Sequence, residues 1–204
     1  MGASSLLRVA GERGYGGLER LTGIPGSVGG MVTMNAGTHL GEIGAIVEQT
    51  EFVGFGSGTG DLEVRTRVHE SSDFTYRRNH FLGPQDLILH AVLRVTPEEP
   101  AHVKAQIEAL YQRRKATQPV DLPSCGSVFM NPREAGLHAW QVVERLGLKG
   151  HRIGNAQISE KHGNFIVNLG GARAAEVRAL IRLVKERARS ELGIDLHEEV
   201  KILT

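Results

Sequence analysis

The sequence predicts an α+β fold built from two parts, and three observations support this prediction. Strand-like patterns dominate residues 1–96, Pro97 and Pro100 then interrupt the chain, and helical periodicity dominates the remaining residues. We therefore expect a first domain at residues 1–96 and a second domain at residues 97–204, with the boundary near Thr96. The chain has 204 residues, which is enough to bury a hydrophobic core without disulfide bonds.

The first domain begins with a short helix at residues 4–13, which Gly14 is able to end. Segment 16–37 comes next, and its many glycines leave no helical or strand period. The same segment is too apolar for a solvated loop, so its backbone N–H groups need partners inside the protein. A bound phosphate or cofactor would satisfy them, and so would turns within the loop.

Three strands complete the first domain, at residues 45–53, 62–68 and 87–95. Apolar and charged residues alternate between Leu62 and Val68, which predicts a strand with one buried face. The strand at 87–95 is more apolar, so we expect it to be the more deeply buried of the two.

The second domain combines helices with short strands. Its clearest element is a helix at residues 172–191, with an apolar stripe of Val177, Leu180, Ile181, Val184 and Ala188. The remaining elements are a helix whose apolar face holds Val103, Ile107, Leu110 and Tyr111, a helix near 135–146, strands at 152–158 and 164–168, and a final strand at 200–203.

Composition and charge exclude several classes of protein. Lys and Arg number 24 against 23 Asp and Glu, so the net charge is only +1 and we expect no nucleic-acid partner. The single cysteine, Cys125, excludes a disulfide framework, and we expect it to be packed rather than nucleophilic. The histidines lack metal-ligand spacing, so no metal site is expected. Without a long apolar run or a signal sequence, the chain is predicted to be cytoplasmic, with no membrane partner.

Three short segments stand apart from these elements. Arg77 lies in Tyr76-Arg77-Arg78 between two strands, where the simpler interpretation is a solvated strand end. Ser127 lies among small and apolar residues, where the simpler interpretation is a turn serine that bonds its own backbone. Glu198 and Glu199 enter the last strand, so one of the two carboxylates should face inward and need a partner.

Five segments together form a recognisable order along the chain. They are GLERLTGIPGSVGGMVTMNAG, YRRNHF, QPVDLPSCGSVFMNP, GLKGHRIGNAQISEKHGNFIVN and GIDLHEEVKIL. In these segments, from about Gly16 to Leu203, the chain resembles the UDP-N-acetylenolpyruvoylglucosamine reductase (MurB) family of peptidoglycan synthesis, in its shorter type II subtype. The glycines of GIPGSVGG do not form G-x-G-x-x-G, so a Rossmann dinucleotide site is disfavoured.

The resemblance implies a vanillyl-alcohol-oxidase-like (PCMH-type) FAD-binding domain at residues 1–96 and a smaller α+β substrate domain at residues 97–204. It implies that NADPH reduces FAD, which passes hydride to the enolpyruvyl ether of UDP-N-acetylglucosamine enolpyruvate to give UDP-N-acetylmuramate. By motif, Arg77 matches the active-site arginine, Ser127 the proton donor and Glu199 the active-site glutamate. These three side chains are expected to converge at the substrate.

The same resemblance assigns flavin contacts and reveals departures from the family. The matched flavin contacts are Gly23, Ile24, Pro25, Gly26, Ser27, Gly29, Gly30, Asn35, Ala36, Gly37 and Arg77. Asn79 stands where the family usually has a serine, and Met130 stands where a basic or amide residue is common. No counterpart of the family's N-terminal FAD lobe precedes Met1, so we expect the chain alone to bind FAD poorly.

Two alternatives to the reductase stay open. One is another flavin oxidoreductase of the same fold, although an oxidase would not need the proton donor Ser127. The other is a non-catalytic remnant that binds a nucleotide sugar. The chain is expected to be a monomer.

Overall fold

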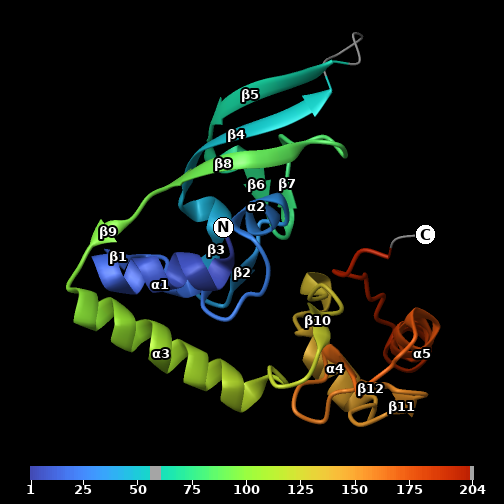
Figure 1. Ribbon diagram of the computed structural model, residues 1–204. Coiled ribbons are helices and arrows are strands. Elements are labelled where there is room, and N and C mark those ends of the chain that lie inside the picture. The colour runs from blue at the N-terminus through green and yellow to red at the C-terminus, as the bar shows by residue number, and fades with distance from the viewer. Residues whose placement is uncertain (56–60, 203–204) are drawn as a thin grey trace. The chain divides into compact units, whose positions relative to one another are not determined.

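The computed structural model describes residues 1–55 and 61–202 (Figure 1). By internal contacts the chain forms two compact units, Met1–Gln112 and Arg113–Thr204. The division falls within helix α3 (Pro100–Thr117). The expected boundary near residue 96, between an FAD-binding and a substrate domain, stays a prediction. Among the described helices, none is both long and apolar enough to cross a membrane.

The first unit contains helices α1 and α2, most of α3 and several short antiparallel ladders. Its elements are α1 (Ala3–Arg13), β1 (Tyr15–Gly16), α2 (Val28–Thr33), β2 (Gly37–Thr38), β3 (Gly41–Glu42), β4 (Val47–Phe55), β5 (Leu62–Val68), β6 (Phe74–Thr75), β7 (Arg78–Asn79), β8 (Leu87–Leu93) and β9 (Thr96–Pro97). β1 pairs with β9, β2 with β3, and β6 with β7, while β5, β4 and β8 form one sheet in that order. The predicted helix at 4–13 and the three predicted strands are confirmed.

Helix α2 contradicts the expectation that the glycine-rich segment holds no regular structure. The helix forms because the Ser27 side chain caps it, accepting a hydrogen bond from the Gly30 N–H at 3.1 Å. Met31 and Val32 on its next turn are buried in the core of the first unit. Burial of these two side chains outweighs the low helix propensity of the neighbouring glycines.

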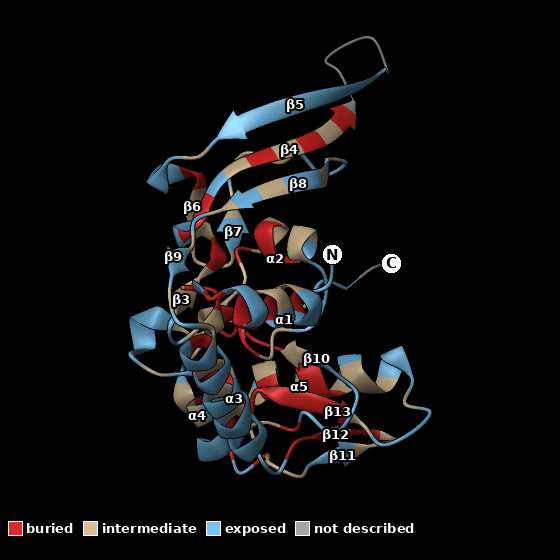
Figure 2. Cartoon of the chain, turned by 60° about the vertical axis from the view of Figure 1, so that its left-hand side comes forward, coloured by how far each residue is buried: buried red, intermediate tan, exposed pale blue. Residues whose placement is uncertain are grey.

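In the sheet β5-β4-β8 the buried residues lie in β4, which carries red segments in Figure 2, whereas β5 is pale blue throughout. Phe52 of β4 is buried, and Ile88 of β8 packs against the core. All seven residues of β5 are exposed, so the prediction of a half-buried strand is wrong. The prediction of a deeply buried β8 is also wrong, because Leu87 and Val92 are 64% and 50% exposed. The alternation of apolar and polar residues shows which face of the sheet each residue lies on. The apolar residues of the outer face stay exposed because no described element covers that face.

Helix α3 confirms the predicted helix but not its predicted apolar face. Val103 is its only buried residue, Ile107 and Leu110 are half-buried, and Tyr111 is exposed.

The second unit is organised around one antiparallel sheet and a long helix. Its elements are β10 (Ser124–Ser127), α4 (Ala139–Arg145), β11 (Arg152–Ile153), β12 (Ala156–Ile158), β13 (Phe165–Asn168) and α5 (Ala174–Leu192). The strand order is β10-β13-β12-β11. Leu180, Ile181, Val184 and Ala188 of α5 are buried in its core, which confirms the predicted stripe. The predicted strand at 152–158 is a hairpin of two, and the helix near 135–146 is the shorter α4.

The predicted final strand does not form in the described part of residues 200–203. Glu198 makes an isolated antiparallel bridge with Phe129, and residues 199–202 are not in a strand. The N–H groups of Glu199 and Val200 both donate to the Val128 carbonyl, at 2.8 and 3.4 Å. Two donors on one acceptor break the regular alternation of a ladder, so pairing stops here.

Candidate functional site

Arg77 is held at the tip of a two-residue hairpin in the first unit. β6 pairs with β7 through Phe74–Asn79 and Thr75–Arg78, which leaves Tyr76 and Arg77 in the turn. Arg77 has the left-handed backbone conformation, with φ of 57°. Its side chain is only 17% exposed. The simpler interpretation of a solvated strand end is therefore wrong.

The Arg77 guanidinium is fixed by groups from the glycine-rich segment and its continuation. Nη2 donates to the Gly37 carbonyl at 2.9 Å, and Nη1 donates to Glu42 Oε1 at 3.4 Å. The guanidinium also lies 5.1 Å from the centre of the Tyr76 ring. These contacts preset the direction of a permanently charged, planar donor.

Asn35 connects this arginine to the rest of the first unit. Its side chain is buried and its φ is 42°. Nδ2 donates to Glu42 Oε2 at 2.7 Å and to the Thr75 carbonyl at 2.8 Å, while Oδ1 accepts from the Gly44 N–H at 2.9 Å. The predicted residues Asn35, Gly37 and Arg77 therefore belong to one network with Glu42.

Glu42 is a residue that sequence reasoning missed. It is the only carboxylate between Glu19 and Glu48. That isolated charge in an apolar, glycine-rich stretch is the signal that could have identified it, because such a carboxylate needs partners.

Ala36 follows α2, where its N–H donates to the Met31 carbonyl at 2.8 Å, and the other predicted flavin contacts lie in the loop before α2 and in α2 itself. Gly23 and Gly26 have φ of 76° and 109°, a conformation that glycine adopts without strain. The start of α1 anchors the loop, since the Ala3 N–H donates to the Gly26 carbonyl at 2.9 Å. A Cβ added at Gly26 would meet no atom within 4 Å, so there is open space beside this backbone.

The second unit brings Ser127 and Glu199 close to each other. Ser127 ends β10 and pairs with Phe165 of β13, where the register of the ladder shifts. The carbonyl of the next residue, Val128, accepts a hydrogen bond from the Glu199 N–H at 2.8 Å. Glu199 is thus hydrogen-bonded through its backbone to the residue after Ser127, although the two lie far apart in the sequence.

A buried asparagine stabilises this meeting point. Asn164 Oδ1 accepts from the Phe129 N–H at 2.9 Å, and its Nδ2 donates to the Phe129 carbonyl at 2.8 Å. Asn164 is 4% exposed and Phe129 is 2% exposed. Satisfying both backbone groups of Phe129 fixes the chain shortly after Ser127.

The interpretation of Ser127 as a turn serine is not supported. It is Ser124 whose Oγ accepts from the Gly126 N–H, at 3.4 Å, while Ser127 itself lies in the ladder. Gly126 between them has φ of 79°. Cys125 is exposed, so the expectation of a packed thiol is wrong. Neighbouring protein atoms nevertheless raise the pKa of this thiol, which disfavours the nucleophilic thiolate.

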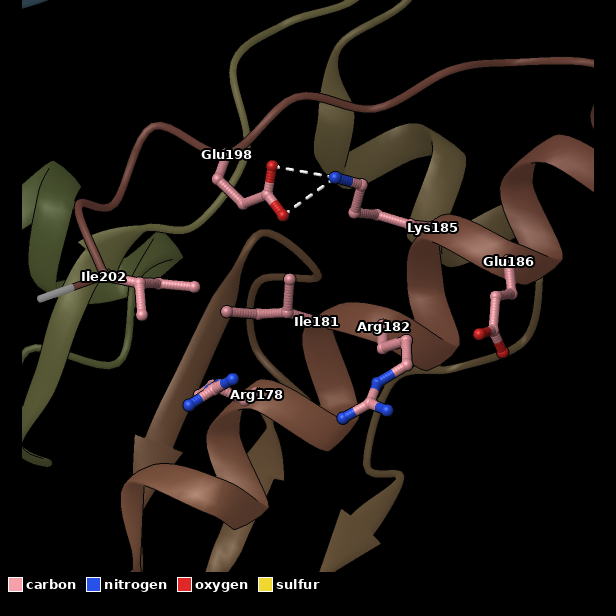
Figure 3. Close-up of a pocket in the computed structure, with 7 residues that line it drawn as sticks. All are labelled: Arg178, Ile181, Arg182, Lys185, Glu186, Glu198 and Ile202. Carbon is pink, nitrogen blue, oxygen red and sulfur yellow. Dashed lines mark hydrogen bonds and ion pairs between the residues drawn. The ribbon is translucent and has the colours of Figure 1, made fainter. Parts of the chain in front are cut away.

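Glu198 is paired with a lysine of helix α5. Glu198 accepts two hydrogen bonds from Lys185 Nζ, each 2.8 Å long. This contact lowers the pKa of Glu198. Glu198 lines a pocket of about 410 Å³, which Figure 3 shows between α5 and the C-terminal segment. The lining residues are Arg178, Ile181, Arg182, Lys185, Glu186, Glu198 and Ile202.

The two departures from the family pattern have local roles. Asn79 Nδ2 donates to the Thr33 carbonyl at 2.6 Å, and its Oδ1 accepts from the Leu82 N–H at 2.9 Å. It therefore connects β7 to the end of α2. The Met130 N–H donates to the His197 carbonyl at 2.9 Å, which joins the serine segment to the glutamate segment through the backbone.

Among the catalytic residues expected from sequence, Ser127 and Glu199 lie in segments that are joined by the backbone hydrogen bond from Glu199 to Val128. Arg77 belongs to the first unit, so the expected convergence of all three side chains stays a prediction.

A solved structure with a similar fold indicates the class of protein to which this chain is related. The crystal structure of UDP-N-acetylenolpyruvylglucosamine reductase (MurB) from Thermus caldophilus is similar, with a TM-score of 0.81 and 34% sequence identity. The match covers 100% of this chain and 70% of that one. The chain is therefore an α+β protein with a MurB-like fold. The family model of the UDP-N-acetylenolpyruvoylglucosamine reductase C-terminal domain matches residues 118–203.

Sequence relatives identify the family. The UDP-N-acetylenolpyruvoylglucosamine reductase of Moorella thermoacetica is 41% identical over 97% of this chain and 63% of its own length. The protein of the same name from Bacillus velezensis is 41% identical over 99% of this chain and 66% of its own length. The chain belongs to the UDP-N-acetylenolpyruvoylglucosamine reductase (MurB) family and spans somewhat less than two thirds of the length of these relatives.

Proposed function

We propose that this chain supplies the catalytic side chains of an NADPH-dependent flavoenzyme that reduces UDP-N-acetylglucosamine enolpyruvate to UDP-N-acetylmuramate. The observation that carries the proposal is the backbone hydrogen bond from Glu199 to Val128, the residue after Ser127, in the unit that contains the family-model match. The names of the relatives support the reaction type. Residues 1–96 are proposed as part of a vanillyl-alcohol-oxidase-like (PCMH-type) FAD-binding domain, and residues 97–204 as the substrate domain.

The glycine-rich segment fits a flavin cofactor. The open space beside Gly26 would let a ligand approach the backbone closely. Gly23–Gly30 and Asn35–Gly37 would hold FAD. When bound, FAD would supply the hydride that it receives from NADPH.

We assign to Arg77 the binding of the substrate carboxylate. Addition of hydride to the enolpyruvyl group moves negative charge onto that carboxylate. A guanidinium binds such a planar oxyanion through two parallel hydrogen bonds, and it remains charged at every physiological pH. Because Gly37 and Glu42 already fix Arg77, little reorganisation is needed when the charge develops.

We assign to Ser127 the donation of a proton to the α-carbon of the substrate. A hydroxyl is a weak acid in water, but it donates to a strongly basic carbon when it is held in line. General acid catalysis of this kind contributes about 10²–10⁴-fold. Glu199 is assigned the positioning of this hydroxyl, or a share in stabilising the intermediate.

The decisive experiment separates the two half-reactions of the FAD-loaded protein by stopped flow. Ser127→Ala should leave flavin reduction by NADPH nearly unchanged and slow reoxidation by substrate about 10²–10⁴-fold. Ser124→Ala is the matched control, since Ser124 lies in the same strand and its hydroxyl bonds the local backbone. Equal impairment of both half-reactions by Ser127→Ala would show that the serine is structural.

The alternatives are tested by calorimetric titration of the chain with the enolpyruvate substrate, with and without FAD. With FAD bound and NADPH added as the reductant, the reductase proposal predicts turnover of the substrate. Substrate binding without turnover would instead favour a nucleotide-sugar-binding remnant. Turnover of a different alcohol or nucleotide sugar, with no requirement for Ser127, would favour another flavin oxidoreductase.

A further inference from the structure

A row of buried polar side chains connects the sheet of the first unit to the hairpin that carries Arg77. Thr50 Oγ1 of β4 lies 2.8 Å from His69 Nε2, and His69 Nδ1 lies 2.9 Å from Asp73 Oδ2. Thr50 is 1% exposed, and the side chains of His69 and Asp73 are 2% and 5% exposed. Buried polar groups need partners, and in this row each side chain is satisfied by its neighbour.

The Asp73 carboxylate fixes the direction of the imidazole. Oδ2 accepts from Arg67 Nε at 3.0 Å and from the Glu70 N–H at 3.1 Å, and Oδ1 accepts from Arg67 Nη2. The hydrogen bond from Arg67 lowers the pKa of Asp73, so this carboxylate is ionised and only accepts hydrogen bonds. The hydrogen shared between His69 and Asp73 therefore lies on Nδ1 of the imidazole.

A hydroxyl, an imidazole and a carboxylate in this order also form the triad of nucleophilic hydrolases. That role needs a hydroxyl that a substrate can reach. Thr50 is 1% exposed, so the geometry excludes it as a nucleophile. The row must therefore act on the structure around it.

The His69 ring contacts aromatic side chains at both ends of the hairpin. Phe74 begins β6, and Phe81 lies just beyond the end of β7. The centre of the His69 ring is 5.1 Å from that of Phe74 and 4.4 Å from that of Phe81. The two phenylalanine rings are 5.5 Å apart in an edge-to-face arrangement. One imidazole thus packs against both strands' outer ends.

The hairpin depends on these contacts because it is short. β6 and β7 have two residues each, and a two-stranded hairpin alone is marginally stable at best. At its open end the His80 N–H donates to the Asp73 carbonyl at 2.9 Å. A Cβ added at Gly44 would lie 2.5 Å from Cγ of Phe74, so this ring is also confined by the backbone at Gly44. Whatever holds Asp73 and Phe74 therefore directs the turn that carries Arg77.

We propose that His69 is a positioning residue for Arg77. Its hydrogen bond to Asp73 sets the direction of the β6–β7 hairpin and thereby holds the guanidinium where it meets the substrate carboxylate. The inference rests on the proposed function, in which Arg77 binds that carboxylate. Because its side chain is 2% exposed, His69 acts through the hairpin rather than by contact with the substrate.

Two substitutions at one position separate the two hydrogen bonds of the imidazole. In His69→Asn the side-chain NH₂ takes the place of Nδ1 and still donates to Asp73. In His69→Gln the longer side chain brings its amide to the place of Nε2, near Thr50, and the hydrogen bond to Asp73 is lost. Both variants remove the ring from the aromatic cluster. Each is therefore the matched control for the other, and urea unfolding checks that their stabilities are similar.

The first measurement needs no cofactor. NMR on the chain itself follows the exchange of the Arg77 guanidinium hydrogens with water, which the hydrogen bond to the Gly37 carbonyl slows. A displaced hairpin weakens that hydrogen bond, so we expect exchange about tenfold faster in His69→Gln than in His69→Asn. Equal exchange in the two variants would overturn the proposal, because ring packing rather than the bond to Asp73 would then hold the hairpin.

The second measurement distinguishes this inference from the proposed function. In the FAD-loaded protein, reoxidation by the enolpyruvate substrate should be about 10²-fold slower in His69→Gln than in His69→Asn, with equal reduction by NADPH. Faster Arg77 exchange without slower reoxidation would support the positioning of Arg77 by His69 and refute the assignment of Arg77 to the substrate carboxylate. Slower reoxidation with equal Arg77 exchange would overturn the positioning role itself.

Nitrogen NMR of the wild-type chain gives a test that needs no variant. The nitrogen shifts of an imidazole report which of its two nitrogens carries hydrogen. The proposal requires a hydrogen on Nδ1 of His69, directed at Asp73. A ring hydrogen carried by Nε2 alone would remove the contact on which the proposal depends and would overturn it.

Discussion

The two units use apolar residues differently. In the second unit, Leu180, Ile181 and Val184 of α5 are buried against the sheet and the segments around it. In the first unit, Val64 and Val92 lie in strands with equally clear apolar patterns, yet they remain 61% and 50% exposed. The comparison teaches that a periodic pattern identifies an apolar face, but burial depends on a second element that covers it.

The largest expected effect on stability tests this contrast directly. Leu180→Ala should reduce the free energy of unfolding by about 2–5 kcal/mol, because it leaves a cavity in a closed core. Leu62→Ala, at a position that is 66% exposed, should change it by about 0.5 kcal/mol or less. Urea unfolding of both variants measures the difference. Similar losses would mean that Leu62 is buried in solution.

Two buried asparagines provide the next comparison. Asn164→Ala in the second unit leaves the N–H and carbonyl of Phe129 without their partner, which should cost about 2–3 kcal/mol. Asn35→Ala in the first unit removes three hydrogen bonds and should cost a similar amount.

The two asparagine variants differ in their local consequences. Hydrogen exchange should increase around Ser127 and Glu199 for Asn164→Ala, and around Arg77 for Asn35→Ala. Gln112→Ala is the control, because Gln112 is exposed on α3 and its side chain bonds the exposed Glu108 one turn earlier. An Asn164 variant with unchanged stability would contradict its assigned role.

The smallest expected effects are changes of stability with pH, caused by one ion-paired carboxylate in each unit. Hydrogen bonds from Arg67 lower the pKa of Asp73, and those from Lys185 lower the pKa of Glu198. A carboxylate whose pKa is lower in the folded state stabilises the protein above its usual pKa, and this stabilisation is lost as the pH falls. Asp73 is the more buried of the two, so the first unit should lose more stability in acid.

Thermal unfolding between neutral pH and about pH 3 measures this difference. Asp73→Asn should flatten the acid decline strongly and Glu198→Gln only slightly. A larger effect of Glu198→Gln would reverse the assigned order of burial.

Much of the candidate site can be predicted from sequence, but its connections cannot. The motifs predict roles for Arg77, Ser127 and Glu199, since each lies in a segment that resembles the family. Glu42 and Asn164 belong to the same surroundings, yet no local pattern distinguishes their roles. Those roles arise from hydrogen bonds to residues that are distant in the chain.

The sequence by itself determined where the helices and most strands lie, because helix and strand periods are local properties of the chain. It also determined the family, through five motifs in one order. Only the tertiary structure decided that α2 forms among glycines, that no described element covers the outer face of β5 and that the Glu199 backbone bonds Val128, the residue after Ser127. Each of these depends on contacts between distant segments, which local periodicity does not encode.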